Sequence, residues 1–160
     1  MRLTNRTDIA IRTLMYLAIY EDRIITIDEI VEKSLSHRSQ VVSCVQTLRK
    51  NGYINSTVGR SGGISLAKRP DQIVISSIVK LIEPDFFLTE CEEKACQSRC
   101  AIYESCHLKK VLHEALSCFF QHLDTVTLAD IVSNRDELRR AIAQSRLPAT
   151  QSSLSGAAGT

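Results

Sequence analysis

Apolar residues in the first fifty positions recur every three or four residues, which is the period of an amphipathic helix. The first stripe predicts a helix over residues 8–20, with Thr7 as its N-cap and Asp8 in its first turn. A capping-box pattern at residues 26–29 starts the second stripe and predicts a short helix that ends near Ser34. The chain is therefore expected to begin with two helices.

A third stripe predicts a helix that begins near Ser36 or Ser39 and ends at residues 51–52, where Gly52 suits a left-handed cap. The face of this helix that is expected to point inward carries Val41, Val42, Val45 and Leu48. Its opposite face is polar and basic. Such a division predicts a helix that packs on a core and shows its polar side to solvent or to a partner.

Two β-prone stretches follow, at residues 53–58 and 64–66. The glycine-rich segment 59–63 between them permits the positive φ angles with which a hairpin reverses direction. Three helices followed by such a hairpin predict a winged helix-turn-helix, with the hairpin as its wing.

After the wing, Val74 and Ile75 are expected to form a short strand. Ser76 is then expected to cap a helix that stops at Pro84, because the residue before a proline disfavours the helical conformation. Two more short helices are expected near the C-terminus, the first capped by Thr127. They cover residues 128–132 and 136–144.

A continuous apolar stripe begins at Leu108 and predicts a helix of about 16 residues or more. A stripe of this length outside the compact front of the chain is expected to pair with its symmetry mate in a homodimer. The residues expected at this contact are Leu112, Leu116 and Phe119.

The expected fold is mainly α: a winged helix-turn-helix with a β-hairpin wing, a long C-terminal dimerisation helix and a cysteine-rich loop. Residues 1–75 are expected to form the DNA-binding domain, and residues 76–146 the dimerisation helix and the loop. Residues 147–160 are small and polar and predict a disordered tail, because they bury too little surface to offset their ordering entropy.

Charge is distributed unevenly along the 160 residues, although the net charge is only +2. Residues 1–70 hold 11 basic and 6 acidic side chains, whereas residues 71–160 hold 9 and 12. A basic front half suits a polyanion such as DNA. The chain lacks both an apolar run near the roughly 18 residues of a membrane helix and a secretory signal pattern, so a cytoplasmic protein is expected.

In a helix-turn-helix, the second helix of the pair enters the major groove with its N-terminal residues at the base edges. Here these residues are His37, Arg38, Ser39 and Gln40. Arg38 has the fork geometry that reads guanine, and Gln40 can bracket adenine. The other DNA contacts expected are Ser43 on the same helix, Arg60 and Ser61 at the wing tip, and Lys68. The competing interpretation is a solvated polar face.

Four of the six cysteines lie within sixteen residues: Cys91, Cys96, Cys100 and Cys106. In a reducing compartment this clustering indicates a metal or iron–sulfur site before it indicates disulfides. The gaps of four, three and five residues differ from the paired Cys-x-x-Cys knuckles of a zinc finger, so an iron–sulfur cluster is favoured and zinc stays open. The remaining two, Cys44 and Cys118, are expected to be small core residues.

Several short motifs, in order over about residues 1–133, resemble the Rrf family of dimeric winged-helix transcription regulators. They are Met1-Arg2-Leu3-Thr4 with Thr7-Asp8, Asn51-Gly52-Tyr53-Ile54, residues 59–64 (GRSGGI), residues 83–86 (EPDF), the cysteines, residues 106–109 (CHLK) and residues 127–130 (TLAD). The resemblance implies a homodimer, double-stranded operator DNA as its partner, and an iron–sulfur cluster with four irons or, as an alternative, two.

Within the family, the chain is most similar to the nitric-oxide-sensing subgroup, the NsrR-like repressors, which implies release of operator DNA when nitric oxide reacts with the cluster. The resemblance assigns Cys91, Cys100 and Cys106 as ligands, with Asp8 of the partner subunit as the fourth. Cys96 is an additional thiol and stays an alternative ligand. Ser43 stands where relatives commonly carry a lysine, so no operator sequence is carried over. An acid in the first turn of a helix is also stabilised by the helix dipole alone.

The main alternative is a regulator that responds to iron or iron–sulfur supply, as in the RirA-like and IscR-like subgroups. A zinc-stabilised DNA-binding protein and a thiol redox protein are further alternatives. An enzyme is not expected, because the sequence lacks a Cys-x-x-Cys beside a βαβ pattern, a glycine-rich phosphate loop and a Ser/His/Asp constellation.

Overall fold

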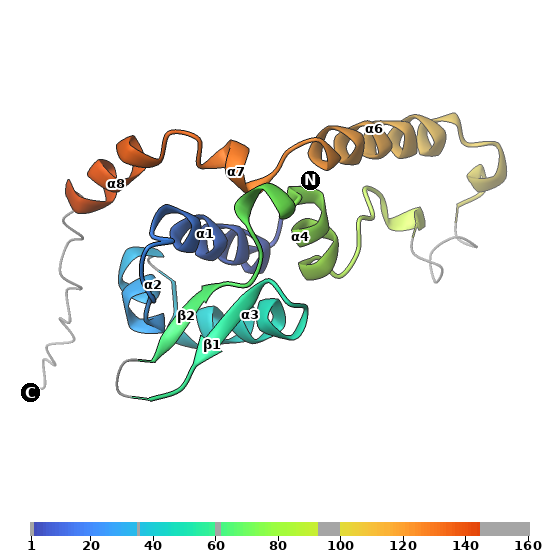
Figure 1. The fold of residues 1–160 in the computed structure, drawn as a ribbon. Helices are drawn as coiled ribbons and strands as arrows, with labels where there is room; N and C mark the ends of the chain where they lie inside the picture. The colour runs from blue at the N-terminus through green and yellow to red at the C-terminus, as the bar shows by residue number, and fades with distance from the viewer. Residues whose placement is uncertain (1, 35, 60–61, 93–99, 145–160) are drawn as a thin grey trace, which may run out of the picture.

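The computed structural model describes residues 2–34, 36–59, 62–92 and 100–144. The helices and strands in Figure 1 are α1 (Asn5–Ile19), α2 (Ile27–Ser34), α3 (Arg38–Lys50), β1 (Ile54–Thr57), β2 (Gly63–Leu66), α4 (Ile75–Ile82), α6 (His107–Asp124), α7 (Leu128–Ile131) and α8 (Arg135–Gln144). Short 3₁₀ turns cover Pro70–Gln72, Glu90–Glu92 and Tyr103–Ser105. The predicted mainly helical fold with a two-stranded wing is confirmed.

The first helix, α1, is the centre of the fold and packs against α2, α3, α4, α7, α8 and β2. Its buried apolar side chains are Ile9, Ala10, Leu14, Tyr16, Leu17, Ala18 and Ile19. The predicted start of this helix is wrong by one turn. Thr4 is the N-cap, and its hydroxyl accepts the backbone N–H of Thr7 at 3.4 Å. Thr7 is buried inside the helix, because it lies on the side that faces the core.

The predicted bounds of α2 are confirmed, but its capping box forms only in part. The Thr26 hydroxyl accepts the backbone N–H of Glu29 at 3.2 Å, as expected. The Glu29 carboxylate binds the Tyr16 hydroxyl and the Arg23 guanidinium instead of returning to Thr26. Charge-assisted bonds of this kind are stronger than a bond to a neutral backbone N–H, which explains the choice.

The second helix of the pair, α3, begins at Arg38 and ends as predicted, with Gly52 at a φ of 72°. Its buried side chains are Val41, Cys44, Val45 and Leu48, whereas Val42 is half-buried. Cys44 is therefore a core residue, as expected.

The wing pairs β1 and β2 in antiparallel register, with Ile54 opposite Leu66 and Thr57 opposite Gly63. A bridge that the sequence did not predict adds Ile25 to its edge: Ile25 and Ile64 exchange backbone hydrogen bonds of 3.0 and 2.7 Å. A Cβ atom at position 63 would lie 2.5 Å from the Ile25 carbonyl oxygen, so only glycine fits there.

The strand predicted at Val74 and Ile75 is wrong. Val74 makes an isolated bridge with Thr127, and α4 already begins at Ile75. Ser76 therefore lies inside the first turn, where it is buried, and its hydroxyl donates to the Asp124 carboxylate at the end of α6. This bond joins α4 to α6.

The long helix α6 has the predicted start and length, but none of its described side chains is buried within the protomer. Figure 1 shows that it extends away from the winged-helix body, and it packs mainly against α4. Cys118, expected in the core, is exposed, because one neighbouring helix covers only one side of α6.

The two predicted C-terminal helices are confirmed as α7 and α8, and a capping box of Thr127 and Asp130 opens α7. Leu138 and Ile142 of α8 pack on the core. The predicted tail, residues 147–160, lies outside the described residues. Among the helices of the described chain, none is both long and apolar enough to cross a membrane.

Candidate nucleic-acid interface and cysteine loop

The residues predicted to read DNA gather at the N-terminal half of α3. His37 is the N-cap residue, and its side chain makes no capping bond. The side chains of His37, Arg38, Ser39 and Ser43 are exposed, whereas Gln40 is half-buried. We call this group of five polar residues the reading surface: His37, Arg38, Ser39, Gln40 and Ser43.

Two side chains of the reading surface contact residues that the sequence analysis missed. Arg38 forms an ion pair with Asp28 of α2. The amide oxygen of Gln40 accepts a hydrogen bond from the Asn5 side-chain amide at 3.2 Å. A guanidinium has five N–H donors, so the ion pair with Asp28 leaves Arg38 further donors for a base. No local pattern signals either partner, because each lies on a different helix.

The wing exposes one apolar side chain next to its tip: Val58, which follows β1, is 95% exposed. Arg60 and Ser61, predicted to contact DNA, lie outside the described residues. Lys68 is exposed, and its ammonium group lies 4.4 Å from the centre of the Tyr53 ring, so it is held over the base of the wing.

The five cysteines in the described part of the chain are free thiols. Three of them lie near the undescribed segment 93–99: Cys91 in the turn Glu90–Glu92 before it, Cys100 directly after it, and Cys106 further on, as the N-cap residue of α6. All three are half-buried, and the Cys91 sulfur lies 3.1 Å from the Thr89 hydroxyl. Cys96, the alternative ligand, lies outside the described residues.

These thiols fit an iron–sulfur cluster by their chemistry, because each is unpaired and thiolate sulfur is the usual ligand of such a cluster. Within residues 2–34, 36–59, 62–92 and 100–144, no three His, Cys, Asp or Glu side chains converge as metal ligands.

Asp8 lies in the first turn of α1, half exposed, with its carboxylate 2.9 Å from the Arg12 guanidinium. This i,i+4 pair holds the carboxylate on the helix surface. The structure does not bring Asp8 together with the cysteines of its own protomer into a metal site in the described chain.

The start of α1 is bound to the end of α4 and to α3. Glu83, at the end of α4, accepts the Thr4 backbone N–H at 2.7 Å and the Thr4 hydroxyl at 3.1 Å. Burial raises the pKa of Glu83, but hydrogen bonds from Thr7 and Thr4 outweigh it and hold that pKa below its usual value. The Cys44 thiol of α3 lies 3.5 Å from the Arg6 carbonyl oxygen, to which it can donate.

The apolar face of α6 is the third predicted feature. Leu112, Leu116 and Phe119 are half-buried, and Leu108 and Val111 are 59% and 47% exposed. Leu116 and Phe119 line a cleft of about 220 Å³ together with Leu3 and Phe87. An apolar surface of this kind on a protomer is typical of an interaction surface.

Known proteins resemble this chain along most of its length. A transcriptional regulator of Geobacillus kaustophilus named NsrR is 39% identical over 147 residues, which cover 91% of this chain and 99% of the relative. The NsrR regulator of Bacillus licheniformis is 35% identical over 143 residues, with 89% and 99% covered. The predicted similarity to the NsrR-like subgroup is confirmed.

Solved structures share the fold. T. potens IscR superposes with a TM-score of 0.67 at 19% identity and covers 92% of this chain and 94% of its own. The oxidized form of Staphylococcus aureus CymR has a TM-score of 0.65 at 21% identity, with 82% and 95% covered. The sequence pattern that defines the Rrf2 family matches residues 3–134. The chain therefore belongs to the Rrf2 family of iron-dependent transcriptional regulators.

Proposed function

We propose that this protein is a homodimeric repressor that binds operator DNA and releases it when nitric oxide reacts with an iron–sulfur cluster. The observation that carries the proposal is the similarity to regulators named NsrR along nearly the full length of both chains. The proposed location is the cytoplasm, because the proposed partner is DNA.

The proposed cluster ligands are Cys91, Cys100 and Cys106, with Asp8 of the partner subunit as the fourth and Cys96 as the alternative. Three observations support this set: the thiols are free, they are half-buried, and they lie close together in the chain. A cluster, proposed to hold four irons, would supply iron atoms that bind nitric oxide. Asp8 suits a ligand for a partner, because its carboxylate is exposed on the protomer surface.

The chain's own residues would couple the loop to DNA through the first turn of α1. Glu83, which ends α4 before the segment that leads to Cys91, accepts the Thr4 backbone N–H. Asn5, the next residue, donates its side-chain amide to Gln40 on the reading surface. A change in how Asp8 is held therefore acts on the same helical turn that contacts α3. Such a switch needs only a few kcal/mol of bias between two states.

We propose that residues 1–75 read DNA and that residues 76–146 dimerise and carry the cluster. Pairing of two α6 helices through Leu112, Leu116 and Phe119 would set the separation of the two reading surfaces. The half-sites of an approximately palindromic operator would then lie about 34 Å apart, which is one helical turn. Arg38, Gln40 and the wing residues Arg60, Ser61 and Lys68 would contact this operator.

The experiment is a titration of anaerobically purified protein with nitric oxide, followed by visible absorption, iron and sulfide content, and operator binding. A coloured cluster whose spectrum changes in parallel with loss of DNA binding supports the proposal. A cluster that ignores nitric oxide but responds to iron chelators favours the iron-responsive alternative. A colourless zinc protein contradicts both.

Three variants sharpen this experiment. Cys106→Ser should lose the cluster, because the thiolate is replaced by a poor ligand for iron. Cys118→Ser is the matched control. Cys118 is a free, exposed thiol in α6, the helix that Cys106 caps, and its replacement should leave the spectrum unchanged. Asp8→Ala tests the bridge: an unchanged nitric oxide response and unchanged operator affinity would contradict the role of Asp8.

A further inference from the structure

Two arginines of α8 converge on one backbone carbonyl at the end of α1. The Arg135 Nε atom donates to the Ile19 oxygen at 2.7 Å, and the Arg139 Nε atom donates to the same oxygen at 2.9 Å. The last carbonyls of a helix lack partners within it and carry partial negative charge. The two guanidinium groups therefore cap the C-terminus of α1 from a helix more than a hundred residues away in the chain.

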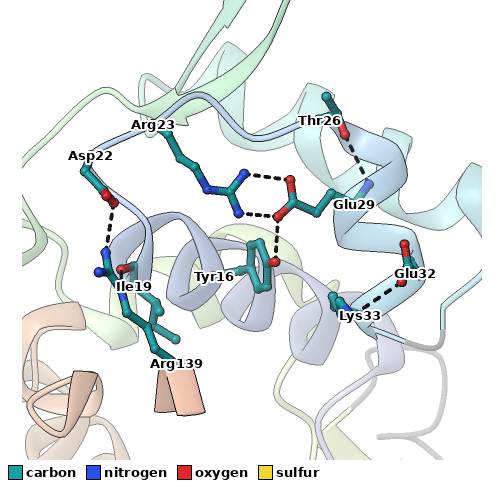
Figure 2. A network of polar contacts seen from close by, with 9 residues as sticks. All are labelled: Tyr16, Ile19, Asp22, Arg23, Thr26, Glu29, Glu32, Lys33 and Arg139. Atoms are coloured by element: carbon teal, nitrogen blue, oxygen red, sulfur yellow. Dashed lines mark hydrogen bonds and ion pairs between the residues drawn. The ribbon is translucent and has the colours of Figure 1, made fainter. Parts of the chain in front are cut away.

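Each arginine also binds an acid in the turn that leads from α1 to α2. Arg135 Nη1 lies 3.2 Å from the Glu21 carboxylate, and Arg139 Nη2 lies 2.8 Å from the Asp22 carboxylate. Figure 2 shows Arg139 bridging Ile19 and Asp22 in this way. Each fork thus spans a helix end and the turn after it, which fixes the direction in which the chain leaves α1. We call Arg135 and Arg139 the arginine clamp.

Contacts continue from the arginine clamp to α2 through Tyr20. The Arg139 guanidinium lies 5.2 Å from the centre of the Tyr20 ring, and the Arg23 guanidinium lies 4.6 Å from it. Arg23 forms an ion pair with Glu29 of α2, and the Tyr16 hydroxyl donates to the same carboxylate at 2.8 Å (Figure 2). The clamp, the turn and α2 therefore form one connected polar network.

The network ends next to the reading surface. Asp28, which adjoins Glu29 in α2, forms the ion pair with Arg38 at the start of α3. In the view of Figure 1, α8 lies above α1 and the wing lies below it, so the arginine clamp is placed away from the wing. The clamp thus contacts the end of α1 and the turn that leads into the helix-turn-helix.

We propose that Arg135 and Arg139 are positioning residues for DNA binding: they hold α1, its following turn and α2 so that Arg38 meets a base edge. This inference rests on the part of the proposed function in which α3 reads DNA, and it requires neither a cluster nor nitric oxide. The ion pairs themselves are partly exposed, so their removal should cost little global stability. The arginine clamp should therefore affect DNA binding more than folding.

The test compares three variants with the wild type: Arg135→Gln/Arg139→Gln, the conservative Arg139→Lys, and Arg140→Gln as control. Arg140 lies on the same helix, and its Nε atom donates only within α8, to the Asp136 carbonyl oxygen, among the bonds seen here. The DNA probe is a duplex selected by the wild-type protein from a random pool. Binding is measured by fluorescence anisotropy at several salt concentrations, together with thermal unfolding and the cluster spectrum.

The double variant should stay folded, keep the wild-type spectrum, and bind the selected duplex at least about tenfold more weakly, with an unchanged salt dependence. An unchanged salt dependence separates positioning from direct phosphate contact, since each lost phosphate contact lowers the slope by about one. Arg139→Lys should lie between wild type and the double variant, because an ammonium group lacks the fork that spans two acceptors. Arg140→Gln should bind like wild type.

Wild-type affinity in the double variant would overturn the inference, and so would a reduced salt slope. Hydrogen exchange provides a readout that needs no DNA: backbone amides of α2 and the first turn of α3 should exchange faster in the double variant only. Unchanged exchange there would also overturn it, even if the double variant were destabilised elsewhere. If the wild type selects no duplex while this exchange effect is present, the proposed function fails and the clamp remains as a structural brace.

Discussion

Glu83 and Thr4 are 79 positions apart in the chain, yet one carboxylate oxygen of Glu83 accepts both the backbone N–H and the hydroxyl of Thr4. Thr4 is the N-cap of α1, and Glu83 ends α4 just before the segment that leads to Cys91. The carboxylate also complements the positive end of the α1 dipole. This pair therefore fastens the start of the central helix to the start of the cysteine loop.

Replacement of Glu83 tests this fastening. Glu83→Ala should lower the free energy of unfolding by about 1–2 kcal/mol, because it leaves a helix N-terminus without its charged acceptor. Asp85→Ala is the control in the same segment, since the Asp85 carboxylate accepts only the nearby Phe87 N–H among the bonds seen here. Urea denaturation of both variants measures the difference. Equal stabilities would show that the Glu83 bond contributes nothing.

The pH dependence of stability follows from Glu29 and Tyr16. The Arg23 guanidinium holds the pKa of Glu29 below its usual 4.5, so the folded state binds fewer protons than the unfolded chain in that range. Stability from Glu29 is therefore present above pH 4.5 and lost as the pH falls. Burial raises the pKa of Tyr16 above its usual 10.0, so its contribution is present below pH 10 and lost as the pH rises.

Urea midpoints measured from pH 3 to pH 11 check both directions. Glu29→Gln should reduce the fall of the urea midpoint at acid pH, and Tyr16→Phe should reduce its fall at alkaline pH. If both variants follow the wild-type curve, the pH dependence of stability comes from other groups.

The core around α1 and α4 should dominate the stability of the protomer. Ile78 of α4 is fully buried, so Ile78→Ala should lower the free energy of unfolding by about 2–5 kcal/mol, through lost burial and the cavity left behind. Val58 is 95% exposed, and Val58→Ala should change the free energy of unfolding by less than about 0.5 kcal/mol. Thermal or urea unfolding of the two variants makes the comparison, and similar losses would contradict this assignment of the core.

The apolar face of α6 should govern self-association. Leu112→Glu and Leu116→Glu should convert a dimer into a monomer in analytical ultracentrifugation, because each places a charge where an apolar contact is proposed. Circular dichroism should show unchanged helix content, since no described side chain of α6 is buried within the protomer. Gln121→Glu, on an exposed position of the same helix, is the control. A dimer that survives both leucine changes would place the interface elsewhere.

Arg38 should discriminate one base pair. Arg38→Ala should cost about 1–3 kcal/mol of binding free energy on the preferred duplex and little on a duplex changed at that base pair. Asp28→Ala should weaken the same discrimination, because Asp28 orients the guanidinium. Arg49 is an exposed cation in the last turn of α3, so Arg49→Ala should instead weaken binding to all sequences equally, through lost attraction to phosphates. Uniform losses for Arg38→Ala would make that residue a phosphate contact.

Local patterns along the chain were enough to predict most of the secondary structure and the family. Apolar periodicity, capping patterns and glycines act over about four residues, and for that reason they located α2, α4, α6, α7, α8 and the wing to within a few residues. The same reasoning placed Arg38 and Gln40 at the start of α3. It also identified the cysteines as a group, because their spacing is visible in the chain.

The packing of the helices selected among the bonds and positions that the local sequence allowed to each side chain. Thr4 rather than Thr7 caps α1, Ser76 binds α6 instead of capping α4, and Cys118 is exposed although its helix carries an apolar stripe. It also decided the long-range bonds of Glu83 to Thr4 and of Arg135 to Ile19, which join residues 79 and 116 positions apart. A local pattern carries no information about such partners, because their proximity results from packing the helices around one core.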